Sequence, residues 1–123
     1  MKENEISYDI RGAAFKVFNK LGPGLLESIY EHALVYELER MGHNVRRQVG
    51  IPVKYDDMPL ELGFRLDIIV DDLVIIEVKS VDQLLDIHYK QLLSYLRLTG
   101  RKLGLLINFN STDMTKSIIR IIN

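Results

Sequence analysis

The stretch from residue 63 to residue 79 constrains the fold of this chain more than any other. It contains two apolar runs rich in β-branched residues, 64–70 and 74–78, on either side of Asp71-Asp72. Such runs around a short polar turn predict a β-hairpin. Three charged residues interrupt the apolar runs and are out of place in a core: Asp67, Glu77 and Lys79. Any function of the hairpin is therefore expected to involve these three side chains.

The register of the hairpin decides whether the charges meet, because successive side chains of a strand point to opposite faces. A two-residue turn would place Asp67 opposite Ile76, whereas a three-residue connection places it opposite Glu77. The second register also pairs apolar residues with one another, and a slip by one residue would bury charge among aliphatic side chains. We therefore predict the three-residue connection, which also places Arg65 opposite Lys79.

Two carboxylates that face each other across strands repel. At ~4 Å the repulsion is about 1 kcal/mol in water and about 4 kcal/mol at an effective dielectric constant of 20. A divalent cation would offset this cost, and hard oxygen ligands suit Mg²⁺ or Mn²⁺. The alternative is an ordinary ion-pair cluster, in which Lys79 and Arg65 neutralise the two acids. The hairpin alone leaves both interpretations open.

Composition and hydrophobic periodicity predict one globular α/β domain over residues 1–123. The chain is 47% hydrophobic and 27% charged, which is ordinary for a soluble protein. Apolar periodicity predicts helices at about 5–21, 24–41 and 82–99, and strands at 44–55, 64–70, 74–78, 103–109 and 117–122. The expected fold is a mixed central sheet flanked by helices, with three antiparallel strands followed by a parallel β-α-β unit. Pro52 predicts an edge strand or a bulge, and Asp82 is the expected N-cap of the third helix.

Several classes of protein are excluded by what the sequence lacks. The absence of cysteine rules out disulfides and thiolate metal sites and fits a reducing compartment. The polar first residues do not form a signal or transit peptide, and no apolar run reaches the ~20 residues that span a membrane. We therefore expect a cytoplasmic protein. The net charge of −1 argues against a protein that coats nucleic acid through a broad basic surface.

Polar side chains recur on two of the predicted helices. His88, Gln91 and Tyr95 lie three and four residues apart, so they share a helix face. Packing does not require such a row, and it would line the acidic pocket if that face points at the hairpin. His88 is a phosphate contact, a local proton carrier or a helix-surface histidine. Glu27 lies on the same side of its helix as Tyr30, and is either a first-turn acid favoured by the helix dipole or a residue that reaches the hairpin carboxylates.

Together these residues resemble the active-site series of the PD-(D/E)XK nuclease superfamily, in the arrangement of its RecB-type branch. The matching positions are Asp67, Glu77-Val78-Lys79 as E-x-K, and Gln91 with Tyr95 as Q-x-x-x-Y. Upstream, residues 24–30 fit G-x-x-E-x-x-Y, the motif that names the GxxExxY family of that superfamily. Leu66 stands where the superfamily name has Pro, which removes no chemical group. The resemblance extends from about residue 10 to residue 122.

The resemblance implies a restriction-endonuclease-like fold and metal-dependent hydrolysis of phosphodiester bonds, with 5′-phosphate and 3′-hydroxyl products. It implies that Asp67, Glu77 and the main-chain carbonyl of Val78 hold Mg²⁺ or Mn²⁺. Glu27 would complete the metal shell or support a second ion. Lys79 would orient or activate the attacking water.

The remaining polar residues receive positioning roles from the same resemblance. Gln91 and Tyr95 would position the phosphate or the lysine, and Tyr30 would orient the first-turn glutamate. Arg65 and His88 would help to position the substrate. The expected partner is nucleic acid, DNA rather than RNA, and no membrane.

Two rival interpretations remain at this point. The first is a non-cleaving module on the same fold that binds nucleic acid or protein. The second is an interaction protein whose apolar segment, residues 118–122, pairs strands in a homodimer.

Overall fold

The computed structural model describes residues 2–123, apart from the side chains of residues 61 and 62. The elements follow in the order α1 (Lys2–Leu21), α2 (Glu27–Arg40), β1 (Val45–Tyr55), β2 (Met58–Val70), β3 (Val74–Lys79), α3 (Asp86–Thr99), β4 (Leu103–Asn108), the 3₁₀ turn η1 (Met114–Lys116) and β5 (Ile118–Ile122). The strands form one five-stranded sheet in the order β1-β2-β3-β4-β5. β3 and β4 are parallel, and the other neighbours are antiparallel. The predicted mixed α/β fold is confirmed.

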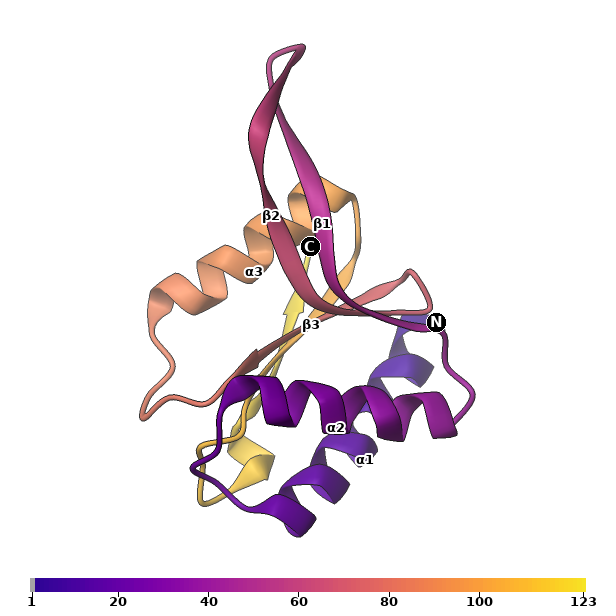
Figure 1. Cartoon of the computed structure of the whole chain (residues 1–123), viewed down its shortest axis with the longest axis vertical. Coiled ribbons are helices and arrows are strands. Elements are labelled where there is room, and N and C mark those ends of the chain that lie inside the picture. The colour runs from indigo at the N-terminus through magenta and orange to yellow at the C-terminus, as the bar shows by residue number, and fades with distance from the viewer. Residues whose placement is uncertain (1) are drawn as a thin grey trace.

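The sheet separates two helical layers (Figure 1). α1 and α2 pack on one face through residues such as Ile10 and Leu34. α3 packs on the other face through Leu92 and Leu96. The distal parts of β1 and β2 project from the layered body as a two-stranded arm (Figure 1). The middle of β3 therefore lies between both layers, and a charged side chain there is withdrawn from water.

The β2–β3 hairpin has the register that the sequence predicts. Ile68 pairs with Ile76, and Val70 pairs with Val74. The connection uses Asp71 and Asp72 at φ values of 53° and 58°, a left-handed conformation that aspartate tolerates better than most residues. The ladder ends just before the two acidic residues of the hairpin.

α3 begins at Asp86, so the prediction that Asp82 caps this helix is wrong. Asp82 lies before the helix, where it accepts a hydrogen bond at 3.3 Å from the side-chain amide of Asn110, in the loop that follows β4. The N-cap residue is instead Leu85, whose side chain makes no capping hydrogen bond. The N–H of Leu85 donates to Nδ1 of His88 at 3.0 Å, so the histidine side chain provides an acceptor for a main-chain N–H at the start of the helix. Pro52, as predicted, lies at a register irregularity in an edge strand.

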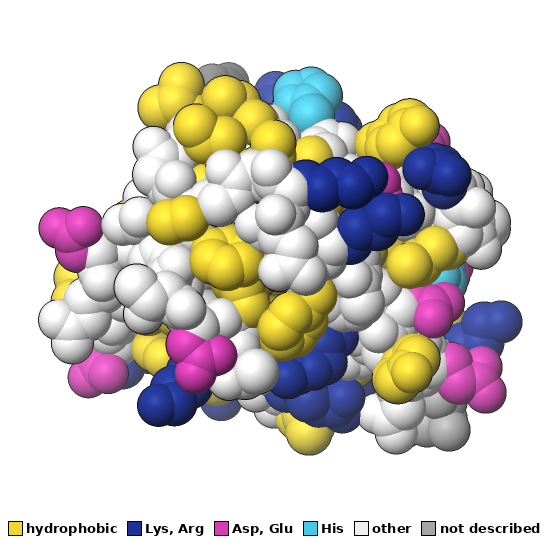
Figure 2. Space-filling view, turned by 90° about the horizontal axis from the view of Figure 1, so that it is seen from below, with side chains coloured by type: hydrophobic (Ala, Val, Ile, Leu, Met, Phe, Trp, Pro, Cys, Tyr) yellow, Lys and Arg dark blue, Asp and Glu magenta, His cyan; other side chains and the backbone are white. Residues whose placement is uncertain are grey.

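The surface around the helices carries charges of both signs. Seen from below, the molecule shows Lys and Arg side chains interspersed with hydrophobic and acidic ones (Figure 2). This face is therefore not a broad basic surface of the kind that coats nucleic acid. Within residues 2–123, no helix combines the length and the hydrophobicity needed to cross a bilayer.

Candidate active site

Asp67 and Glu77 lie next to each other where the β2–β3 ladder ends. Oδ2 of Asp67 accepts a hydrogen bond from the N–H of Val78 at 2.9 Å. The aspartate side chain thus ties β2 to β3 at a level where the main-chain ladder has stopped. Asp67 is partly exposed, whereas Glu77 is only 5% exposed. The hairpin therefore presents one accessible and one buried carboxyl group at the same spot.

Glu77 is a buried acid that lacks a partner for one of its oxygens. Its Oε1 is the buried side-chain atom that has no hydrogen-bond partner among the described residues. Burial, followed by the neighbouring carboxylate of Asp67, raises the pKa of Glu77 to about 10, against a smaller opposing effect of Lys79. Glu77 therefore keeps its proton near neutral pH in the metal-free protein. This proton relieves the repulsion that the sequence led us to assign to a cation or to ion pairs.

The ion-pair alternative is not realised in the described part of the chain. Neither Lys79 nor Arg65 lies within ion-pair distance of Asp67 or Glu77 there. Arg65 is exposed, pairs with β1 rather than with Lys79, and donates from Nη1 to the main-chain carbonyl of Gln48 at 3.2 Å. Lys79 is partly buried and close enough for its charge to lower the pKa of Glu77. Within the described part of the chain, the ammonium of Lys79 is thus near Asp67 and Glu77 but forms no ion pair with either of them.

α3 places Tyr95 close to the acids, with Gln91 beside this tyrosine. Burial, and then the charges of Glu77 and Asp67, raise the pKa of Tyr95, while a hydrogen bond with Gln91 lowers it. The ring of Tyr95 also stacks on Phe64 of β2, with centroids 4.3 Å apart, which fixes the hydroxyl over the hairpin. His88, which shares this helix face, instead caps α3.

Glu27 and Tyr30 lie near the end of β3 but have other partners. Oε2 of Glu27 accepts a hydrogen bond from the N–H of Ser80 at 3.2 Å. Among the residues that the structure describes, no three His, Cys, Asp or Glu side chains are grouped so that they could hold one ion. A role of Glu27 in the metal shell stays a prediction. Tyr30 is fully buried, and its hydroxyl donates to the carbonyl of Gly22 and accepts from the N–H of Leu25. It fixes the turn that precedes α2.

Two residues that hold the end of β3 were missed in the sequence analysis. The hydroxyl of Ser80 donates to the carbonyl of Leu25 at 2.6 Å. The side-chain amide of Asn108 binds both main-chain polar groups of Val81, at 3.1 and 2.9 Å. Asn108 is 6% exposed and lies opposite Lys79 in the β3–β4 ladder. An amide that ends an otherwise apolar strand was the available signal for this role.

The donor set suits a small divalent cation. An unpaired, buried carboxyl oxygen lies beside a second carboxyl group and the main chain of Val78. Mg²⁺ is usually held by one or two carboxylates and keeps several waters. Asp67, Glu77 and the carbonyl of Val78 would together offer a donor set of this kind without a third carboxylate. Binding would require Glu77 to release its proton.

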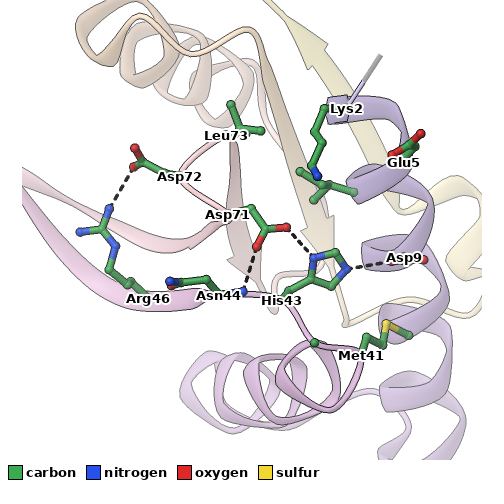
Figure 3. Close-up of a pocket in the computed structure, with 12 residues that line it drawn as sticks. Lys2, Glu5, Asp9, Met41, His43, Asn44, Arg46, Asp71, Asp72 and Leu73 are labelled. Carbon is green, nitrogen blue, oxygen red and sulfur yellow. Dashed lines mark hydrogen bonds and ion pairs between the residues drawn. The ribbon is translucent and has the colours of Figure 1, made fainter.

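Two cavities flank the hairpin at its opposite ends. One, of about 670 Å³, lies beside the β2–β3 turn and is lined by α1, the α2–β1 connection and the turn (Figure 3). There the ring of His43 lies between Asp71 and Asp9, with its nitrogens 2.6 and 2.8 Å from their carboxylate oxygens. These polar groups of the cavity are therefore already hydrogen-bonded to one another. The other, of about 630 Å³, opens where β3 and β4 end and includes Asn108 and Lys116. Only the second adjoins the chain that follows Lys79.

Comparison with known proteins agrees with the geometry at the level of a superfamily. The family described as "PD-(D/E)XK nuclease superfamily" matches residues 4–121. No curated protein and no solved structure matches the chain. The narrower resemblance to the GxxExxY family stays a prediction.

Proposed function

The chain belongs to the PD-(D/E)XK nuclease superfamily, and on this premise we propose that it is a metal-dependent nuclease acting on DNA rather than RNA. The observation that carries the proposal is the buried, unpaired oxygen of Glu77 beside Asp67. A buried acid without a partner costs free energy, and proteins retain such costs mainly at functional sites. The products would be a 5′-phosphate and a 3′-hydroxyl.

The hairpin residues would hold the metal and the water. Asp67, Glu77 and the carbonyl of Val78 are the proposed ligands of Mg²⁺ or Mn²⁺. A bound divalent cation would lower the pKa of a water and stabilise charge on the scissile phosphate. The ammonium of Lys79, which forms no ion pair with the acids among the described residues, would orient the attacking water. It would also neutralise charge that develops on the phosphoryl oxygens.

Residues around the hairpin would position the substrate. Tyr95, which lies near the acids, and Gln91, which lies beside Tyr95, would hold a phosphate oxygen or the ammonium of Lys79. Arg65 is exposed on β2 and could contact a neighbouring phosphate, a contact that positions a strand without reading its sequence. Glu27, bound to the N–H of Ser80, would fix the chain that follows the lysine. The polar cavity where β3 and β4 end leaves room for a substrate strand.

A non-cleaving module that binds nucleic acid or protein is the second candidate. The net charge of −1 and the mixed charges of the surface in Figure 2 favour it, since nucleases that grip long substrates present basic surface. A binding module, however, would not need an unpaired buried glutamate with a lysine close by. The enzyme therefore accounts for more of the structure.

Cleavage of labelled DNA and RNA, each single- and double-stranded, tests the proposal in the presence of Mg²⁺, Mn²⁺ or EDTA. We expect metal-dependent cleavage of DNA that Glu77→Gln abolishes, because the substitution removes a metal ligand. Lys79→Ala should still bind Mn²⁺ in calorimetry but cut more slowly. Lys102→Gln changes an exposed lysine before β4 and should cut at the wild-type rate. Undiminished cleavage by Glu77→Gln would end the proposal, and binding without cleavage by the wild type would favour the second candidate.

A further inference from the structure

Asp67 lies at a discontinuity of the sheet. Between the described residues of β1 and β2, the ladder includes the residues on either side of Asp67 but passes over Asp67 and Gln48, which face each other. Toward β3, the ladder ends one residue away, at Ile68 and Ile76. The carboxylate of Asp67 instead reaches the N–H of Val78 at 2.9 Å. The position of this acid is therefore set by something other than regular strand pairing.

Gln48 departs from strand geometry at the same level. Its φ is 52°, a left-handed conformation that non-glycine residues rarely adopt within a strand. Its side-chain amide donates to both carboxylate oxygens of Glu31, at 3.0 and 3.1 Å. Nε of Arg47 donates to one of the same oxygens at 3.1 Å, and Arg65 of β2 donates to the carbonyl of Gln48. Side chains on three elements thus hold the kink in β1.

Glu31 is the centre of this arrangement. It belongs to α2 and is 4% exposed, so its carboxylate is nearly withdrawn from water and depends on the donors of Gln48 and Arg47. A buried carboxylate and a left-handed strand residue both cost free energy. Such features persist where the surrounding structure over-determines them, and they cluster at functional sites. Here Gln48 faces Asp67 from the neighbouring strand β1, and Glu31 binds the side chain of Gln48.

We propose that Glu31 and Gln48 are positioning residues for Asp67, an inference that rests on the nuclease function proposed above. Glu31 holds Gln48 in the kinked conformation, and the kink removes the ladder partner of Asp67. Freed from the ladder, Asp67 turns its carboxylate toward β3, where the N–H of Val78 fixes one oxygen beside Glu77. Neither Glu31 nor Gln48 touches the metal or the substrate in this arrangement.

A purely structural role for the same contacts makes a different prediction. If Glu31 only anchored α2 to β1, its removal would destabilise the protein and leave Asp67 where it is. A positioning role predicts in addition that the acid moves, so that the Val78 amide loses more protection than the change in stability explains. The two roles are therefore separated by measuring stability and the Asp67 contact in the same variants.

Gln48→Val is the first test variant, because a β-branched residue disfavours positive φ and favours a regular strand. Because the substitution also removes a donor to the buried Glu31, we expect a lower urea midpoint, together with hydrogen exchange at the Val78 amide in metal-free protein that is faster than this loss of stability alone explains. Mn²⁺ affinity in calorimetry should fall by about tenfold or more, as is typical when a residue that orients a metal ligand is lost. Lys54→Val, which changes an exposed residue further along β1, is the matched control and should leave the exchange rate and the affinity unchanged.

Glu31→Leu is the second variant and covers the case in which Gln48→Val does not fold. Leucine removes the acceptor without leaving a buried charge, a replacement that proteins often tolerate, and we expect the same loss at Val78. Loss of Val78 protection in both folded variants supports the positioning role even if the wild type cuts no substrate. Wild-type exchange at Val78 and wild-type Mn²⁺ affinity in the folded variants would overturn it, even if the protein proves to be an active nuclease.

Discussion

Replacing Glu77 with glutamine should stabilise the metal-free protein at neutral pH. Burial and the carboxylate of Asp67 raise the pKa of Glu77 from its ordinary value of 4.5 to about 10. The folded protein thus keeps a proton that the unfolded chain releases above pH 4.5. A carboxyl group whose pKa is raised by folding adds its full contribution to the free energy of unfolding below its unfolded pKa, and this contribution is lost as the pH rises. Glutamine has the shape of the protonated acid and does not titrate.

The size of the effect follows from the two pKa values. Each pH unit above the unfolded pKa lowers the free energy of unfolding of the wild type by about 1.4 kcal/mol, as long as folded Glu77 stays protonated. Between pH 4.5 and pH 7 this amounts to about 3 kcal/mol. Since Glu77 is only 5% exposed, solvent screening reduces this figure little. Near pH 4 the difference between wild type and variant should vanish.

Urea unfolding in EDTA, followed by circular dichroism at several pH values from 4 to 8, measures this difference. With a slope of about 2 kcal/mol per M, the variant should have a midpoint about 1.5 M higher at pH 7. Glu39→Gln, an exposed glutamate of α2, is the control and should follow the wild type at every pH. Added Mn²⁺ should stabilise the wild type by mass action and leave the Glu77→Gln variant unchanged.

Parallel stability curves for wild type and Glu77→Gln between pH 4 and pH 8 would refute the reasoning, because they would show that folded Glu77 ionises like an exposed acid. Equal stabilisation of both proteins by Mn²⁺ would show that Glu77 is not a ligand. A lower stability of the variant at every pH would mean that Glu77 has a structural partner. In that case the proton on Glu77 would not be what relieves the repulsion between Glu77 and Asp67.

Two further predictions concern other parts of the fold. Burial lowers the pKa of His43, but hydrogen bonds with Asp71 and a second aspartate raise it by more. The stability that protonated His43 adds to the fold is therefore complete below pH 6.5 and is lost at higher pH. Thermal melts of His43→Gln should therefore show a loss of roughly 2 kcal/mol at pH 6 that shrinks toward pH 9; a constant loss would contradict this. Gly63→Ala should cost about 1–3 kcal/mol, because a Cβ there would lie 2.3 Å from the carbonyl oxygen of Ile51. Gly50→Ala, with nothing within 4 Å, should be tolerated, and equal melting temperatures of the two variants would count against this account.

The hairpin could be predicted from sequence because its register depends on neighbouring residues. Apolar alternation and a short turn leave few alternatives, and the pairing of Ile68 with Ile76 confirms the choice. The start of α3 could not be predicted in the same way. Asp82 satisfies the local rule for an N-cap, but the helix begins only at Asp86, and Asp82 instead accepts a hydrogen bond from Asn110 in a loop distant in sequence.

The state of Glu77 shows a second limit of sequence reasoning. The sequence indicated that two carboxyl groups would meet, but the cost of withdrawing one from water depends on both helical layers. Burial is the largest cause of the raised pKa, and it is a property of the whole fold. The same holds for Glu31 and Gln48, which are 17 residues apart and form a pair only once α2 has packed on β1. The local sequence around either residue does not predict that it pairs with the other.

The arm formed by β1 and β2 offers an attachment point remote from the acids. Its tip, Asp56-Asp57, is exposed and joins strands that project beyond the layered body (Figure 1). Exposed turns of this kind tolerate inserted sequence. A fluorophore or an affinity tag placed between Asp56 and Asp57 could therefore immobilise the domain on a surface with both acids and α3 left untouched. Single molecules could then be watched while substrates flow past.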